Sequence, residues 1–178
     1  AYNAPHAPLQ ATEKYLKRYP HIKDKRRKTY AAMVSSIDDG VGDIVSALKE
    51  KNIYNNTIIY FLSDNGGAKS NASNNAPINS HKGTLYEGGI RIPFVMQWPD
   101  EIKGGTIFTK PIISLDIFAT SKAIINPDLQ LENKIHGKDL LPFIKGFDNG
   151  YPHEYLYWRN NGHQPYIENG VRARYITH

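Results

Sequence analysis

The segment TIIYFLSDNGG, from Thr57 to Gly67, is the most informative part of the chain. Its first six residues, Thr57–Leu62, are β-branched, aromatic or aliphatic on both faces, which is typical of a strand buried inside a sheet that is covered on both sides. Oxygen-bearing side chains and two glycines follow at Ser63–Gly67. Because open α/β sheets place ligand sites at the carboxyl ends of their strands, the segment predicts an α/β fold with a ligand site after this strand.

A helix is predicted before this strand, between Thr29 and Lys51, because apolar residues recur there every three or four positions. Asn52 is expected to end this helix. The basic run Lys23–Lys28 precedes it and is typical of a solvated helix start. A nucleic-acid site would interleave aromatic residues with such a run, and the neighbours here are polar, so nucleic acid is a disfavoured partner. The apolar stripe consists of Val34, Ile37, Val41, Ile44, Val45 and Leu48.

Two further regions complete the predicted architecture. An Asn- and Ser-rich loop, Ala68–Ser80, leads toward a second buried strand at Ile92–Trp98, so that helix, strand, loop and strand form one α/β layer. Tyr151–His178 is rich in aromatic residues and contains two Asn-Gly pairs, which predicts hairpin strands of a smaller antiparallel sheet. We therefore expect a main α/β domain at residues 1–125 and a smaller subdomain at residues 126–178.

The composition of the 178 residues, 40% hydrophobic and 22% charged, is ordinary for a globular protein. A net charge of +5 favours polyanionic partners, such as a sulfated glycan, nucleic acid or an acidic membrane, without choosing among them. No apolar run approaches the roughly 20 residues that span a bilayer. The chain contains no cysteine, which leaves its compartment open. Its first residues include neither an initiating Met nor a signal peptide, so we expect it to begin inside a longer protein.

Five positions carry candidate chemistry. Asp64 and Asn65 offer adjacent oxygen ligands suited to calcium or magnesium, although the pair also fits a simple Asx turn. Lys82, followed by a glycine, is a point charge for an anion such as sulfate, although an exposed loop lysine has the same sequence. His6 lies between two prolines that stiffen its backbone, and a histidine there can donate to an anion or act as a general acid. His81, beside Lys82, is a further candidate for substrate binding.

These segments, in this order, resemble the type I sulfatases of the alkaline phosphatase superfamily. The resemblance covers nearly the whole chain and implies the C-terminal part of an alkaline-phosphatase-like α/β sandwich, followed by a small antiparallel-sheet subdomain. The segments that carry it are Pro5–Pro8, Tyr30–Leu48, Asn56–Gly66, Lys82–Thr84, Glu87–Gly89 and Arg91–Pro93, with weaker similarity at Ser114–Ile117, at Gly137–Pro142 and on to Arg172.

The resemblance also implies roles for the candidate residues. Asp64 and Asn65 would be two ligands of a calcium ion, Lys82 would bind the sulfate, and His6 would contact the sulfate or the leaving oxygen. In the family, two acidic residues near the N-terminus complete the metal site, and the nucleophile is a formylglycine made from a Cys/Ser-x-Pro-x-Arg motif. This chain has neither. We therefore expect the chain alone to be inactive and to bind calcium weakly.

The expected function of the parent protein is calcium-dependent hydrolysis of sulfate esters, of sulfated glycans in particular, in the periplasm or outside the cell. Two alternatives stay open at this point. One is a phosphate or phosphonate monoester hydrolase of the same superfamily, which the Lys82–Gly89 segment disfavours. The other is a non-catalytic module that binds acidic polymers through its basic surface. The aromatic segment Tyr151–Tyr166 fits either a sugar subsite or the subdomain core. The sequence gives no indication of the oligomeric state.

Overall fold

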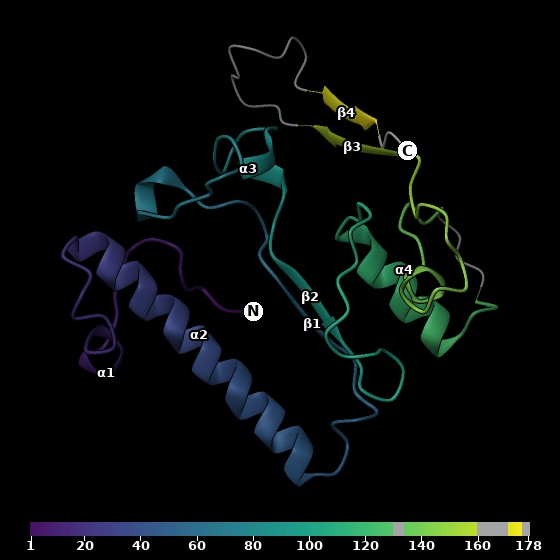
Figure 1. The fold of residues 1–178 in the computed structure, drawn as a ribbon, viewed down its shortest axis with the longest axis horizontal. Coiled ribbons are helices and arrows are strands. Elements are labelled where there is room, and N and C mark those ends of the chain that lie inside the picture. Colours follow the sequence, from purple (N-terminus) through teal and green to yellow (C-terminus); the bar gives the residue numbers. More distant parts are fainter. Residues whose placement is uncertain (130–133, 160–170, 176–178) are drawn as a thin grey trace. The chain divides into compact units, whose positions relative to one another are not determined.

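The computed structural model of the protein describes residues 1–129, 134–159 and 171–175. The chain divides into two compact units, Ala1–Met96 and Gln97–His178; the domain boundary expected near residue 125 stays a prediction. The elements, labelled in Figure 1, are α1 (Glu13–Leu16), α2 (Lys25–Glu50), β1 (Ile59–Leu62), the 3₁₀ turn η1 (Lys69–Asn71), α3 (Glu87–Ile90), β2 (Phe94–Gln97), α4 (Leu115–Ile125), α5 (Leu141–Ile144), β3 (Tyr155–Arg159) and β4 (Val171–Tyr175).

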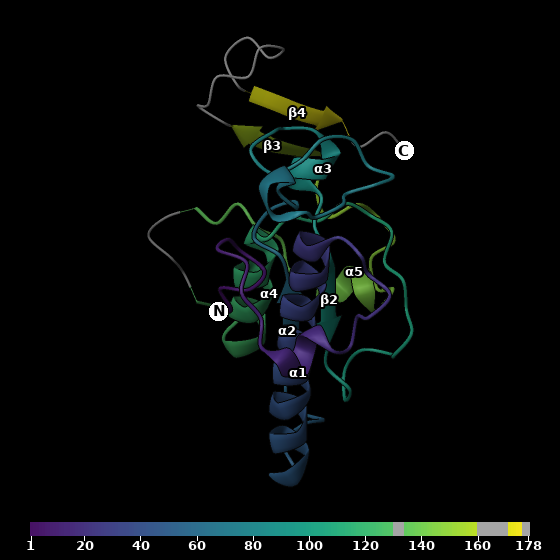
Figure 2. The same ribbon diagram turned by 90° about the vertical axis from the view of Figure 1, so that its left-hand side faces the viewer.

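Helix α2 is the long helix of the first unit (Figure 2). It begins one turn earlier than predicted because Asp24 caps it: the Asp24 carboxylate accepts a hydrogen bond from the Arg27 backbone N–H at 2.6 Å. Asn52, with φ of 57°, follows the C-cap and ends the helix as predicted. The predicted apolar stripe is only partly covered, since Ile37 is buried while Val34 is 41% and Ile44 51% exposed.

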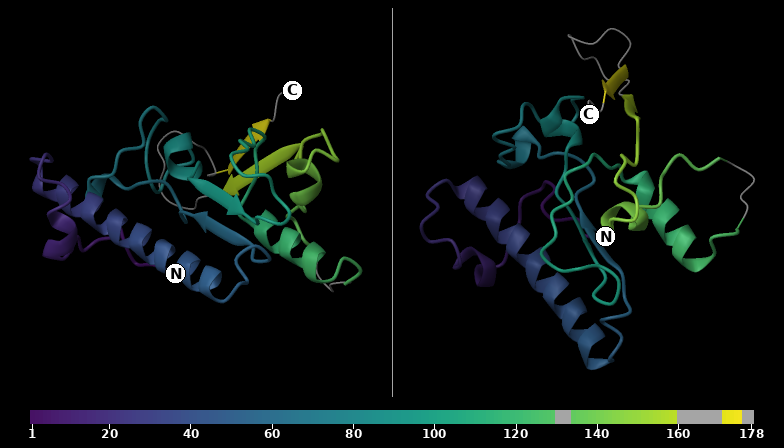
Figure 3. Two further views of the ribbon diagram at one scale, coloured as in Figure 1. Left: turned by 60° about the horizontal axis from the view of Figure 1, so that its bottom comes forward. Right: turned by 45° about the vertical axis from the view of Figure 1, so that its right-hand side comes forward.

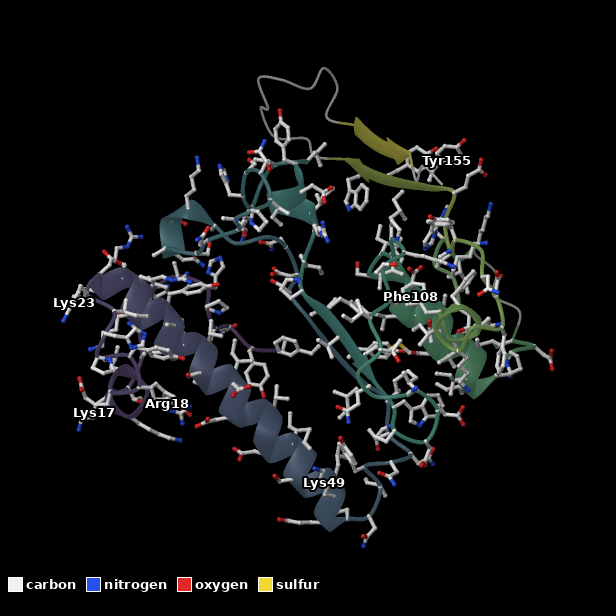
Figure 4. The ribbon with its side chains drawn as sticks, in the orientation of Figure 1. Lys17, Arg18, Lys23, Lys49, Phe108 and Tyr155 are labelled. Carbon is white, nitrogen blue, oxygen red and sulfur yellow. The ribbon has the colours of Figure 1, made fainter. Side chains whose placement is uncertain are left out.

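An ionic cluster joins α1 and its following turn to α2. The guanidinium of Arg18 donates two hydrogen bonds to the Asp39 carboxylate, both at 2.8 Å, and the Lys14 ammonium lies 3.0 Å from the same carboxylate. Arg18 lies beside α2 in Figure 4. The hydrogen bonds from Arg18, and then those from Lys14, hold the pKa of the Asp39 carboxyl well below its usual range. A short hydrogen bond of 2.6 Å between the Tyr19 and Ser35 hydroxyls adds a neutral link to the same helix.

Strands β1 and β2 form a two-stranded sheet (Figure 3). Both strands are shorter than predicted, because Thr57, Ile58, Ile92, Pro93 and Trp98 lie outside regular secondary structure. Large apolar side chains remain exposed on them: Phe61 is 42% and Val95 56% exposed. We predicted that β1 is covered on both faces. The exposure of Phe61 contradicts this prediction, and among the described residues the sheet has no third strand.

The second unit is organised around the fully buried carboxylate of Asp116 in α4. One oxygen accepts the Ile113 N–H at 2.8 Å, and the other accepts the Lys138 N–H at 2.8 Å. His153, itself buried, donates from Nε2 to the same carboxylate at 2.8 and 3.0 Å. A buried carboxylate is costly unless it is fully hydrogen-bonded. Asp116 therefore joins three segments that are distant in the sequence.

Replacement of Asp116 by alanine is expected to destabilise this unit by about 3–5 kcal/mol, because it leaves buried donors without an acceptor. Urea denaturation of the variant measures the loss. The matched control is Asp100→Ala, which removes an exposed carboxylate and should change the unfolding free energy by less than about 0.5 kcal/mol. Equal midpoints for the two variants would show that the Asp116 network does not stabilise the fold.

The predicted C-terminal hairpin is present. Strands β3 and β4 pair antiparallel, from Tyr155 opposite Tyr175 to Arg159 opposite Val171. The Asn-Gly pairs that predicted the hairpin, at residues 161–162 and 169–170, lie outside the described residues. None of the described helices has the length and apolar character that a membrane crossing requires.

Candidate functional site

The turn after β1 places Asp64 and Asn65 beyond a strand end, as predicted. The Ser63 N–H donates to the Pro93 carbonyl at 3.4 Å, next to β2, and the Ser63 hydroxyl donates to the Asn65 carbonyl at 2.8 Å. The Gly66 N–H donates to the Gly89 carbonyl at 3.0 Å. The backbone of the turn is thus fixed to α3 and to the residues just before β2, while Asp64 is exposed and Asn65 half-buried.

Three glycines allow the turn, α3 and the segment around Lys82 to touch. A Cβ on Gly66 would overlap the Gly88 carbonyl, and a Cβ on Gly88 would overlap the carbonyls of Ser80 and Asn79. A Cβ on Gly89 would lie 2.8 Å from the His81 carbonyl and closer still to that of Thr84. Only residues without a side chain fit at these contacts.

Lys82 lies on a loop that is hydrogen-bonded to the turn. Its N–H donates to the Gly67 carbonyl at 3.1 Å, which connects a residue two positions after Asn65 directly to Lys82. Gly83 follows with φ of 87°, a conformation that favours glycine. The His81 ring donates from Nδ1 to the Lys82 carbonyl at 2.8 Å, which supports the Lys82 backbone; substrate binding by His81 stays a prediction.

His6 is brought to the same unit by the loop that follows the turn. The side chain of Asn71, which is buried in η1, donates to the Pro5 carbonyl at 3.2 Å. The His6 ring is exposed, and its Nδ1 donates to the Ala7 carbonyl at 2.7 Å, while its Nε2 has no hydrogen-bond partner among the described residues. All five residues predicted for the site therefore belong to the first compact unit.

The side chains of Asp64, Asn65 and Lys82 have no hydrogen-bond or ion-pair partner among the described residues, although the backbone around them is extensively hydrogen-bonded. Within residues 1–129, 134–159 and 171–175, no side chain forms a hydrogen bond or ion pair with the Asp64 carboxylate, the Asn65 amide or the Lys82 ammonium. Charged groups that lack an internal partner are available to external ions of opposite sign. The arrangement offers two oxygen ligands to a cation and an ammonium to an anion.

The donor set fits part of a calcium site. Carboxylate and amide oxygens are the ligands calcium prefers, but calcium takes about six to eight of them. The described residues contain no group of three or more His, Cys, Asp or Glu side chains that could hold a metal ion. Asp64 and Asn65 are therefore suited to one side of a metal shell, and a complete shell needs further oxygen atoms.

Several residues that shape this site were not predicted. Arg27 donates to the Ala72 carbonyl at 2.9 Å, and Arg26 donates to the Ser70 carbonyl. The basic run Lys23–Lys28 is thus only in part a solvated helix start, because two of its arginines hold the loop after the turn. Asn71 and Asn75 also make side-chain bonds to backbone groups there. The richness of the loop in Asn was the available signal, and it indicated only a surface loop.

Comparison with known proteins places these features in a family. Residues 1–126 match the family model described as Sulfatase. The chain is 37% identical over 136 residues to arylsulfatase J of Mus musculus, covering 74% of this chain and 23% of that protein. It is 35% identical over 150 residues to N-acetylgalactosamine-6-sulfatase of Canis lupus familiaris, covering 82% and 28%. The chain thus spans about a quarter of the length of these relatives.

Solved structures agree with this assignment. The crystal structure of Ps i-CgsB in complex with k-i-k-neocarrahexaose superposes with a TM-score of 0.82 at 42% identity, over 88% of this chain and 35% of that chain. PsFucS1 sulfatase from Pseudoalteromonas sp. gives a TM-score of 0.78 at 29% identity, over 96% and 33%. These matches confirm the predicted alkaline-phosphatase-like α/β fold class. The chain belongs to the sulfatase family and corresponds to a part of a type I sulfatase.

Proposed function

We infer that the protein containing this chain hydrolyses sulfate esters and that this chain supplies the anion-facing lysine and one side of the metal site. The observation that carries this proposal is the backbone hydrogen bond from the Lys82 N–H to the Gly67 carbonyl, which places the Lys82 backbone beside the Asp64–Asn65 turn; the Lys82 ammonium has no ion-pair or hydrogen-bond partner among the described residues. Membership of the sulfatase family supports sulfate as the anion. The two acidic ligands and the nucleophile must come from other parts of the protein, because this chain has no cysteine and no Ser-x-Pro-x-Arg motif.

The residues of this chain have separate tasks in the proposed reaction. The Lys82 ammonium binds a non-bridging sulfate oxygen and offsets the negative charge that these oxygens carry in the transition state. As an imidazolium, with its Nδ1–H on the Ala7 carbonyl, His6 donates its Nε2 proton to the leaving alkoxide oxygen and is left as a neutral imidazole. The oxygens of Asp64 and Asn65 would hold calcium, which when bound supplies Lewis-acid stabilisation of the sulfate oxygens.

A sulfated glycan is the substrate class we propose. The relative with 42% identity was crystallised with k-i-k-neocarrahexaose, and another relative is named as an N-acetylgalactosamine-6-sulfatase. The net charge of +5 favours approach of a polyanion. Because such polymers are outside the cytoplasm, a periplasmic or extracellular location is part of the proposal, and cell fractionation tests it.

The test compares the full-length parent with the 178-residue chain. The parent is expected to release sulfate from an aryl sulfate and from a carrageenan oligosaccharide, and to lose this activity when calcium is chelated. The chain alone should release none, and calorimetry should show only weak calcium binding, because two ligands are far fewer than the shell requires. Faster hydrolysis of aryl phosphate than of aryl sulfate by the parent would instead assign it to the phosphate monoester hydrolases.

A further inference from the structure

The side chain of Asn75 occupies an unusual position in the loop between the turn and Lys82. Its Oδ1 accepts the Gly67 N–H at 2.9 Å, and its Nδ2 donates to the Gly67 carbonyl, also at 2.9 Å. The same Nδ2 donates to the Ser80 carbonyl at 3.2 Å. One carboxamide therefore binds both backbone polar groups of Gly67 and, in addition, the far end of the loop.

The two anchor points of Asn75 flank the candidate site. Gly67 lies two residues after Asn65, and Ser80 lies two residues before Lys82. The Gly67 carbonyl also accepts the Lys82 N–H, so Asn75 and Lys82 share this acceptor. The half-buried carboxamide thus ties the turn that carries the proposed metal ligands to the segment that carries the proposed anion ligand.

The space around Gly67 indicates that this contact is tight. A Cβ on Gly67 would lie 2.9 Å from the Asn75 Oδ1 and 2.6 Å from the Ser73 Cβ. Ser73 is fixed in turn, because its hydroxyl donates to the Ala68 carbonyl at 2.6 Å and its N–H donates to the Asn71 Oδ1 at 3.2 Å. The carboxamide is therefore held in one orientation by its partners and by the packing of the loop.

We propose that Asn75 is a positioning residue that sets the location of the Lys82 ammonium relative to Asp64 and Asn65 by clamping Gly67 to Ser80. The proposal rests on the proposed function for the identity of the anion, but the clamp itself is a property of the loop. The Asn75 carboxamide binds backbone groups of the loop at both of its polar atoms, so we assign it no direct contact with substrate or metal. We infer that Asn75 acts on activity through Lys82. Replacement of a residue that orients a ligand-binding group typically changes activity by about 10–100-fold.

The decisive variant is Asn75→Asp in the full-length parent. Aspartate has the same shape and keeps the acceptor for the Gly67 N–H, but it loses both donors and directs a carboxylate at two carbonyl oxygens. The matched control is Asn74→Asp, which makes the same change of charge at the adjacent residue. Asn74 is exposed and only accepts the Ala76 N–H at 2.9 Å, a bond that aspartate retains.

Kinetics separate positioning from general damage. Asn75→Asp is expected to lower kcat/KM for an aryl sulfate by about 10–100-fold and to weaken inhibition by inorganic sulfate, while Asn74→Asp stays within about twofold of wild type. In a Lys82→Ala background, Asn75→Asp should lower kcat/KM by less than a further factor of about three, because the effects of two substitutions in residues that act as a unit do not add. An undiminished loss in that background, or identical kinetics for the two aspartate variants, would overturn the proposal.

Amide hydrogen exchange provides a readout that does not depend on activity. The Lys82 amide is expected to exchange slowly in wild type and in Asn74→Asp, and at least about tenfold faster in Asn75→Asp, whereas the Gly67 amide keeps its acceptor and serves as an internal reference. Unchanged exchange at the Lys82 amide refutes the clamp even if the parent is an active sulfatase. Faster amide exchange in Asn75→Asp, together with a parent that hydrolyses no sulfate ester, would support the clamp and refute the proposed function.

Discussion

The variant Gly88→Ala is expected to destroy the candidate site while leaving α2 folded. A Cβ at this position would lie 2.5 Å from the Asn79 carbonyl oxygen and closer still to that of Ser80. Both obstacles are backbone atoms, and the Gly88 N–H already donates to the Asn79 carbonyl at 2.6 Å. The clash can be relieved only by moving α3 or the segment that leads to Lys82. We expect sulfate-ester hydrolysis by the parent protein to fall by about 100-fold or more, because an error of about 1 Å in position has that effect.

The control for this prediction is Gly42→Ala in α2. A Cβ on Gly42 has no atom within 4 Å, and alanine is favoured over glycine in a helix by about 0.5–1 kcal/mol. Gly42→Ala should therefore retain activity and melt slightly higher than wild type, whereas Gly88→Ala should lose activity. Comparable activity in both variants would show that the contact of α3 with the loop does not determine the site.

The variant Asp64→Asn tests the proposed calcium-dependent activity, which we expect it to remove without affecting the fold. Asparagine preserves the shape of the side chain, and among the described residues no internal partner of the carboxylate is lost. The charge that would attract calcium disappears, and we expect kcat/KM of the parent to fall by about 100-fold, the equivalent of about 3 kcal/mol of lost stabilisation. Activity measured against calcium concentration checks this, since part of the loss should be recovered at high calcium.

Asp43→Asn is the matched control, because Asp43 is exposed on α2 and is not part of the site. It makes the same chemical change and should leave both activity and its calcium dependence unaltered. If Asp64→Asn behaved in the same way as this control, Asp64 would not be a metal ligand, and the turn after β1 would have only a structural role.

Local signals in the sequence predicted the elements well, because helix periodicity, strand composition and turn residues act over a few neighbours. The strand before Ser63, the long helix that ends at Asn52 and the C-terminal hairpin were all predicted in this way. The start of α2 was predicted one turn too late. The basic residues after Asp24 were interpreted as a solvated run that precedes the helix, whereas the Asp24 side chain caps a helix that already includes them.

Contacts between distant residues could not be predicted from a single sequence. Asp116 and His153 are 37 positions apart, and nothing in either local segment indicates that the two side chains meet. The clamp made by Asn75 was hidden for a different reason, because an Asn-rich loop without periodicity has the same appearance whether its amides face solvent or backbone. The glycines at positions 66, 88 and 89 were visible, but which backbone each one approaches is a property of the folded loop.

The exposed apolar side chains of the first unit have a consequence for handling the chain. Phe61 and Val95 lie outward on a sheet that, among the described residues, has one unpaired edge on each strand. Such edges are templates for intermolecular strand pairing, and the apolar residues add attraction between molecules. When the chain is expressed by itself, we expect association through this sheet to limit its solubility, and a fusion partner that shields the sheet to raise it.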